Sequence, residues 1–146
     1  MPVDTTASIV IERPASDVAA YVRDPDNDPR WIGGIRSARQ LGDAPIGVGT
    51  QVERVAGFLG QRIEYVNEIV ELTTSRLTMR SVRSPFPMRV TYGFDETGPS
   101  TTRAWVRVEG EASGLYGLAA PLLNRAVHRS ISSDVKRLKK LLETTG

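Results

Sequence analysis

Residues 120–143 read APLLNRAVHRSISSDVKRLKKLLE, and this stretch decides the fold class. Apolar side chains recur along it at spacings of three and four: Ala120, Leu123, Val127, Ile131, Val135, Leu138 and Leu142. This spacing places them in one stripe on an α-helix. We therefore predict a long amphipathic C-terminal helix that packs one face against another layer of the fold.

The segments that precede this helix follow a period of two. Met88, Val90, Tyr92 and Phe94 alternate with polar neighbours, which is typical of a strand with one buried face. Only short turns separate the segments, so the strands are expected to form an antiparallel meander. The predicted strands span residues 3–11, 35–41, 49–57, 61–72, 75–83, 87–95 and 101–111.

Two short helices are expected after the first strand. Pro14 suits the start of a helix, and Asp17 places a carboxylate in the first turn, where the helix dipole favours it. Residues 24–32 predict a second very short helix or tight turn, closed by Gly33 and Gly34. The fold class is therefore α+β, with a curved seven-stranded antiparallel sheet wrapped around the long C-terminal helix.

Composition limits the classes of function. The 146 residues match one domain, 1–146, with a net charge of +2, no cysteine and one histidine. Disulfides, thiolate sites and multi-histidine metal centres are excluded, and no cofactor is expected. Residues 1–6 lack the pattern of a secretory signal, so we expect a cytoplasmic protein without stable membrane insertion, as a monomer or weak homodimer.

Arginines also alternate along the predicted strands. Arg76, Arg80, Arg103 and Arg107 fall on the expected outer face of the sheet, near Glu residues of other strands. Cross-strand ion pairs are the natural interpretation. Apart from Trp105, this face lacks the aromatic platforms of nucleic-acid binders, so no nucleic acid is expected as a partner.

Short turn and packing motifs follow one another in a distinctive order along nearly the whole chain. They are IERP at 11–14, DP at 24–25, PRW at 29–31, GVGT at 47–50, FLGQ at 58–61, VEL at 70–72, TR at 102–103, VEGE at 108–111, PLL at 121–123 and LKKLLE at 138–143. In this order the chain resembles the START-like, Bet v 1-like helix-grip (SRPBCC) superfamily, and in particular its bacterial polyketide cyclase/dehydrase–lipid transport branch. The resemblance implies a deep cavity between the sheet and the long helix, but no single function.

Candidate ligand-binding residues follow from the pattern and from this expected cavity. They are Trp31, Phe58, Met79, Met88, Tyr92, Phe94, Leu115, Leu118 and Leu122. Methionine adapts to varied ligand shapes, and a buried tyrosine hydroxyl needs a partner, so Tyr92 is placed to orient a ligand oxygen. For each residue the alternative is ordinary core packing, and for Phe58 a turn residue folded back on the helix.

No catalytic residue is assigned. His128, the single histidine, lies at the border of the apolar stripe and is expected at the surface rather than in a site. Three functions stay open: binding of a small hydrophobic ligand (lipid, isoprenoid, quinone or polyketide-like), a polyketide cyclase/dehydratase-type enzyme, and a protein–protein interaction module. The lack of a convincing acid–base pair favours the first. An ordered Tyr–Arg or His–carboxylate pair deep in the cavity would favour the enzyme, and a cavity filled by side chains would favour the interaction module.

Overall fold

The computed structural model describes residues 3–84, 87–110 and 119–144. Its strands are β1 (Val3–Ile11), β2 (Ile35–Leu41), β3 (Gln51–Phe58), β4 (Gln61–Leu72), β5 (Arg76–Arg83), β6 (Met88–Gly98) and β7 (Thr101–Gly110). Its helices are α1 (Ala15–Arg23), the 3-10 turn η1 (Pro25–Asn27), α2 (Asp28–Trp31) and α3 (Ala120–Thr144). The predicted α+β class and order of elements are confirmed.

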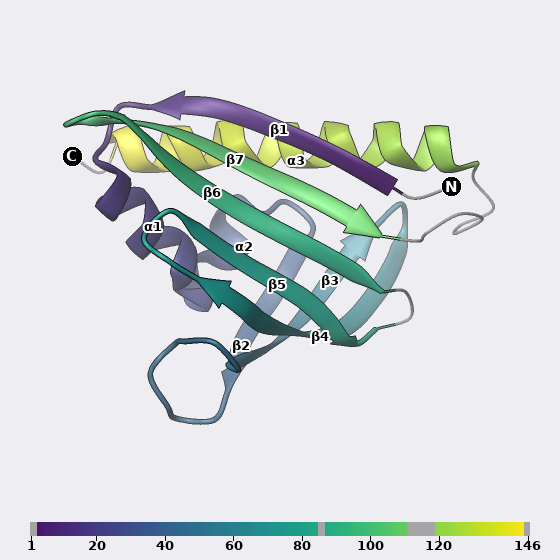
Figure 1. The fold of residues 1–146 in the computed structure, drawn as a ribbon. Helices are drawn as coiled ribbons and strands as arrows, with labels where there is room; N and C mark the ends of the chain where they lie inside the picture. Colours follow the sequence, from purple (N-terminus) through teal and green to yellow (C-terminus); the bar gives the residue numbers. More distant parts are fainter. Residues whose placement is uncertain (1–2, 85–86, 111–118, 145–146) are drawn as a thin grey trace.

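All seven strands join one antiparallel sheet in the order β1-β7-β6-β5-β4-β3-β2. The sheet bends strongly, so that β2 and β3 lie farther back than β6 and β7 in Figure 1. Register shifts at Ile35/Ser37, Val66/Asn67 and Ile69/Glu71 mark places where one strand carries an extra residue. Such bulges bend a strand and increase its twist, which gives this sheet its concave face.

The long helix α3 packs on the concave side with the predicted stripe. Leu123, Ile131, Val135, Leu138 and Leu142 are all buried. Ile131, Val135, Leu138 and Leu142 belong to one core with the inward residues of the strands. The stripe therefore holds α3 against the sheet through apolar burial, the dominant favourable term in folding.

The outer edge of β1 is held to α3 by side chains as well as by apolar packing. A backbone N–H of β1 and another just past its end donate to α3 side chains, and a β1 carbonyl accepts from a third. The bonds are Asp4 N–H to Asn124 Oδ1 at 3.0 Å, Glu12 N–H to Glu143 Oε2 at 2.8 Å, and Lys139 Nζ to Val10 O at 2.8 Å. The helix therefore runs along β1 over nearly its whole length (Figure 1).

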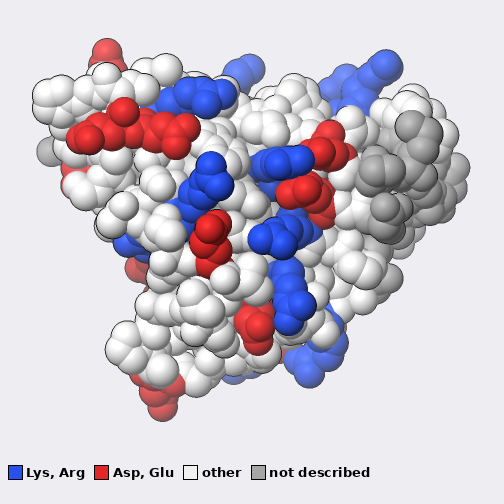
Figure 2. All heavy atoms as spheres, in the orientation of Figure 1, with Lys and Arg blue, Asp and Glu red and all other residues white. Residues whose placement is uncertain are grey.

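Charges of both signs alternate over the face of the molecule shown in Figure 2. A cross-strand pair with a glutamate is confirmed for Arg80, which lies 3.7 Å from Glu68. Arg103 and Arg107 form cross-strand pairs with aspartates instead, with Asp95 at 3.7 Å and Asp4 at 2.8 Å. Arg76 instead lies over the ring of Trp105, 5.6 Å from its centroid. Exposed pairs of this kind contribute little to stability, because water screens the two charges. No described helix is both long and apolar enough to cross a membrane.

Candidate functional site

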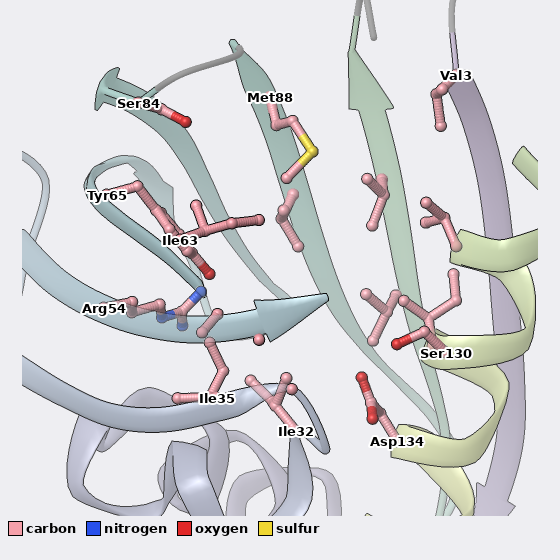
Figure 3. Close-up of a pocket in the computed structure, with 18 of the residues that line it drawn as sticks. Val3, Ile32, Ile35, Arg54, Ile63, Tyr65, Ser84, Met88, Ser130 and Asp134 are labelled. Carbon is pink, nitrogen blue, oxygen red and sulfur yellow. The ribbon is translucent and has the colours of Figure 1, made fainter. Parts of the chain in front are cut away.

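A cavity of about 160 Å³ lies between the concave face of the sheet, α2 and α3. Its wall is mostly apolar, and every layer of the fold contributes to it. The apolar side chains are Val3, Trp31, Ile32, Ile35, Ala56, Ile63, Met88, Val90, Val106, Val108, Leu123, Val127 and Ile131. Figure 3 shows the labelled members of this set around the cavity.

A few polar side chains interrupt this apolar wall on opposite sides. Arg54 and Tyr65 come from β3 and β4, whereas Ser130 and Asp134 come from α3 and face them across the cavity (Figure 3). Tyr92 joins the lining from β6. An apolar hollow with a few placed polar groups is the usual form of a small-molecule site.

On the sheet side of the cavity, Arg54 connects the polar side chains. Its Nε and Nη2 donate to Oδ2 of Asp28 at 3.1 and 2.8 Å, and its Nη1 donates to the hydroxyl of Tyr92 at 3.4 Å. The side chains of Arg54 and Asp28 are 6% and 2% exposed. Burial raises the pKa of Asp28, and the neighbouring guanidinium partly offsets this. Burial is also the main cause that raises the pKa of Tyr92 to about 12, so its hydroxyl stays neutral at physiological pH.

Asp134 links α3 to the residues that end α2. Its Oδ1 accepts from the backbone N–H of Gly33 at 2.9 Å and lies 3.4 Å from Nη1 of Arg137. The same Arg137 nitrogen donates to the carbonyl of Trp31 at 2.8 Å. Burial raises the pKa of Asp134, against the hydrogen bond from Gly33 and the charge of Arg137. This cluster fixes the end of α2 on the helix beneath it.

Trp31 is therefore held firmly at the side of the cavity. It is 1% exposed, and its ring meets that of Tyr92 edge to face, with centroids 5.7 Å apart and planes at 70°. This arrangement suits the charge distribution of aromatic rings. Its indole nitrogen is buried without a hydrogen-bond partner among the described residues.

The sequence as a whole matches a known family. The family described as polyketide cyclase / dehydrase and lipid transport matches residues 2–143. The chain belongs to this family. The resemblance drawn from its turn and packing motifs is thus confirmed. A comparison with curated proteins gives no match.

Solved structures show how widely the fold of this family member is shared. A START superfamily protein from Mycobacterium smegmatis is 14% identical, with a TM-score of 0.85 over 98% of this chain and 99% of that chain. The Zhui aromatase/cyclase from Streptomyces sp. R1128 is 15% identical, with a TM-score of 0.79 over 98% and 94%. Ginseng major latex-like protein 151 from Panax ginseng is 14% identical, with a TM-score of 0.64 over 90% and 96%. At these identities the likeness establishes the helix-grip fold and assigns no ligand.

Three residues expected in the site of this family member line the cavity: Trp31, Met88 and Tyr92. Met79 and Phe94 are each 2% exposed and lie in the packed core outside the lining. Met79 borders a second hollow of about 10 Å³ beside Arg54. Phe94 belongs to the same packed core as Val18 and Val22 of α1.

The remaining expected residues lie elsewhere. Leu122 is 52% exposed, because it precedes the buried stripe residue Leu123 by one position on the helix. Phe58 ends β3, but its side chain lies outside what the structure describes, as do residues Leu115 and Leu118. His128 is exposed, and its Nδ1 lies 2.9 Å from Oγ1 of Thr5, away from the cavity lining. This agrees with its expected surface position.

Sequence reasoning identified Tyr92 but missed the charged residues of the lining, Arg54 and Asp134. A signal for Arg54 was present: it stands between Val52 and Ala56 on the inward face of β3, where an arginine interrupts an apolar alternation. Asp134 likewise adjoins the stripe residue Val135. Charged residues are rarely buried, so a charged residue at a position that the pattern places inside indicates a special role.

Proposed function

We propose that this protein binds a small, largely apolar molecule that carries a polar group, in the cavity between the sheet and α3. One observation supports this most directly: an apolar wall contains a buried Arg54–Tyr92 hydrogen bond whose groups both line the cavity. Burying polar groups is costly unless they are paired, so polar groups at a cavity wall favour a ligand with a matching polar atom. The classes that fit are quinone, polyketide-like, isoprenoid and lipid molecules.

The size of the cavity narrows these classes. Its volume is about 160 Å³, close to the roughly 150 Å³ of an engineered cavity that takes up benzene. A body of one or two rings therefore suits the enclosed part. A longer acyl or isoprenoid chain would have to continue beyond it.

The Arg54–Tyr92 pair also favours a second candidate function, a polyketide cyclase-type enzyme. In such a reaction a proton leaves the carbon beside a carbonyl, and negative charge develops on the carbonyl oxygen. Arg54 and Tyr92 would donate to that oxygen, and Asp134 on the opposite side would accept the proton if ionised. The family description and the Zhui aromatase/cyclase structure support this candidate.

Binding is tested first with native mass spectrometry of the protein from its own host, together with an environment-sensitive dye. We expect a bound apolar species and dye binding. Tyr92→Phe should weaken the binding of a ligand with a polar head and leave the fold intact. Tyr21→Phe is the matched control, because Tyr21 lies on α1 and does not line the cavity. No bound species and no dye binding would refute the proposal.

Catalysis is tested separately with a ketone probe in heavy water. Exchange of the hydrogens beside the carbonyl of 1-tetralone, followed by NMR, reports proton abstraction directly. The enzyme candidate predicts faster exchange with the protein than without it, and loss of this acceleration in Asp134→Asn. Binding of 1-tetralone without faster exchange would leave the protein as a carrier.

A further inference from the structure

The solvent face of α3 carries positive charge that no acidic side chain balances. The helix contains six basic residues and two acidic ones. Neither acidic residue offsets the exposed charge, because Asp134 is buried and Glu143 accepts from Nζ of Lys139 at 2.5 Å. The exposed side chains of α3 that bear a charge are Arg125, Arg129, Lys136, Arg137 and Lys140.

Four of these residues form a straight row, here called the basic row: Arg125, Arg129, Lys136 and Lys140. With 3.6 residues per turn, they fall within about 60° of the helix circumference, opposite the buried stripe that includes Ile131 and Leu138. The row is about 22 Å long. In the described part of the chain, the ion pairs within α3 are Arg137–Asp134 and Lys139–Glu143, and neither involves a member of the row.

The basic row differs from the charged surface of the sheet. Exposed arginines of the strands, such as Arg39, Arg62 and Arg80, each lie within 3.7 Å of a glutamate. The face shown in Figure 2 accordingly carries both signs, which is sufficient for solubility. On α3, by contrast, like charges stand four residues apart, and such pairs weaken a helix. A repulsive row that the chain itself leaves uncompensated indicates that a partner supplies the negative charge.

The chemistry of this face favours an anionic membrane surface over an acidic protein. Protein interfaces depend on aromatic side chains that fill pockets, and the exposed described residues of α3 include no aromatic one. Adsorption to lipid headgroups needs only accessible cations, and four or more on an amphipathic helix are typical of it. Leu122 extends the row at its N-terminal end and is 52% exposed, so its side chain can enter the boundary between headgroups and acyl chains.

We propose that the outer face of α3 is a peripheral docking surface for membranes that contain anionic lipids. The basic row contacts the headgroups, and Leu122 contacts the acyl boundary. The cavity lies on the other side of the same helix, where Leu123, Val127 and Ile131 line it. Docking therefore uses residues separate from the cavity lining. Each basic residue near such a surface contributes about fivefold in affinity, and salt weakens this attraction.

The test is sedimentation of the protein with vesicles of phosphatidylcholine, with and without phosphatidylglycerol as the anionic lipid. We expect the wild type to bind only the anionic vesicles, and to be released in about 0.5 M NaCl. The variant Arg125→Gln/Arg129→Gln/Lys136→Gln/Lys140→Gln should lose affinity on the order of several hundredfold. Glutamine is a good helix former, so α3 should remain folded.

A matched control removes the same number of positive charges from the sheet: Arg39→Gln/Arg62→Gln/Arg80→Gln/Arg103→Gln. It should bind anionic vesicles as the wild type does. Equal loss in the two variants would overturn the inference, because net charge rather than α3 would then cause binding. A wild type that does not bind anionic vesicles would also overturn it and leave an acidic protein as the partner. Dye binding in the cavity tests the proposed function independently and should be the same in all three proteins.

A second measurement locates the contact with one substitution. The chain has no cysteine, so a fluorescent NBD label attaches only where a cysteine is introduced. Ser133→Cys places it on the exposed face of α3, and Ser37→Cys places it on β2, at the sheet edge opposite β1. Anionic vesicles should brighten the label and shift its emission to the blue at position 133 but not at 37. An equal response at both positions, or none at 133, would overturn the inference.

Discussion

Arg54 and Asp28 meet through a single carboxylate oxygen, Oδ2, which accepts from Nε at 3.1 Å and from Nη2 at 2.8 Å. Both side chains are almost fully buried. The pair joins β3 to the first residue of α2, the helix that ends at Trp31. This ion pair between β3 and the four-residue helix α2 therefore helps to fix the position of Trp31 at the cavity wall.

Removing one partner of this pair should be strongly destabilising. Arg54→Met leaves Asp28 buried without its counter-charge, so we expect the free energy of unfolding to fall by about 3–5 kcal/mol. The double variant Asp28→Leu/Arg54→Met removes both charges and should lose less than Arg54→Met alone. Urea denaturation measures all three proteins. If the double variant is as unstable as Arg54→Met, the loss of stability comes from altered packing and not from an uncompensated charge.

Asp134 should make stability depend on pH in a defined direction. Because burial raises its pKa above the ordinary 3.8, the folded protein holds this proton more tightly than the unfolded chain. The contribution to stability is therefore full below the unfolded pKa and is lost as pH rises through the folded pKa. The free energy of unfolding of the wild type minus that of Asp134→Asn should fall as pH rises above about 4, by up to about 1.4 kcal/mol per unit.

Urea denaturation between pH 4 and 7 tests this difference. A constant difference between the wild type and Asp134→Asn across this range would contradict the assignment.

Tyr92 should act in the same direction at alkaline pH. Its pKa of about 12 in the folded protein exceeds the ordinary 10.0, so the unfolded chain loses the phenol proton first. The wild type should then lose stability relative to Tyr92→Phe above about pH 10, by up to about 1.4 kcal/mol per unit. Denaturation at pH 9, 10 and 11 measures this. Parallel stability curves for the two proteins would count against a buried, neutral phenol.

Gly93 should be intolerant of a side chain for one identifiable reason. A Cβ at Gly93 would overlap the indole ring of Trp105, its register partner on β7, because the nearest ring atom would lie 1.9 Å away. Displacing the ring also breaks its bond to Asp95 and its contact with Arg76. We expect Gly93→Ala to cost about 1–3 kcal/mol, as overpacking does.

The matched background for this change is Trp105→Ala. There the obstacle is gone, and an alanine suits a strand interior better than glycine by about 0.5–1 kcal/mol. Gly93→Ala should therefore become neutral or stabilising in Trp105→Ala. If its cost persists, backbone conformation rather than the indole explains the glycine.

Strand periodicity predicted the fold closely because it reflects local physical chemistry. The strands over 3–11 and 61–72 begin and end where the alternation and turn residues place them. The strand predicted over 87–95 runs on to Gly98, because its pairing with β7 continues past Asp95 through a register shift at Glu96/Gly98. The end of a strand depends on how far its neighbour continues to pair with it. The pattern of one strand alone therefore does not predict where that strand ends.

The site was predicted less completely, for a physical reason. Periodicity identifies apolar residues on an inward face, which led to Met88 and Tyr92, but it does not separate cavity wall from packed core, as Met79 and Phe94 show. Periodicity alone also does not show that a charged residue such as Arg54 is buried, because most charged residues lie at the surface. Arg54 acquires its role from Asp28, which is 26 positions away in sequence and meets it only in the folded chain.

The three hydrogen bonds between α3 and the outer edge of β1 also bear on self-association. A free edge strand offers unpaired backbone groups on which another chain can add a strand and start aggregation. Here Asn124, Lys139 and Glu143 occupy backbone groups along that edge, as a neighbouring strand would. The helix that closes the cavity thus also shields the sheet from edge-to-edge polymerisation at β1.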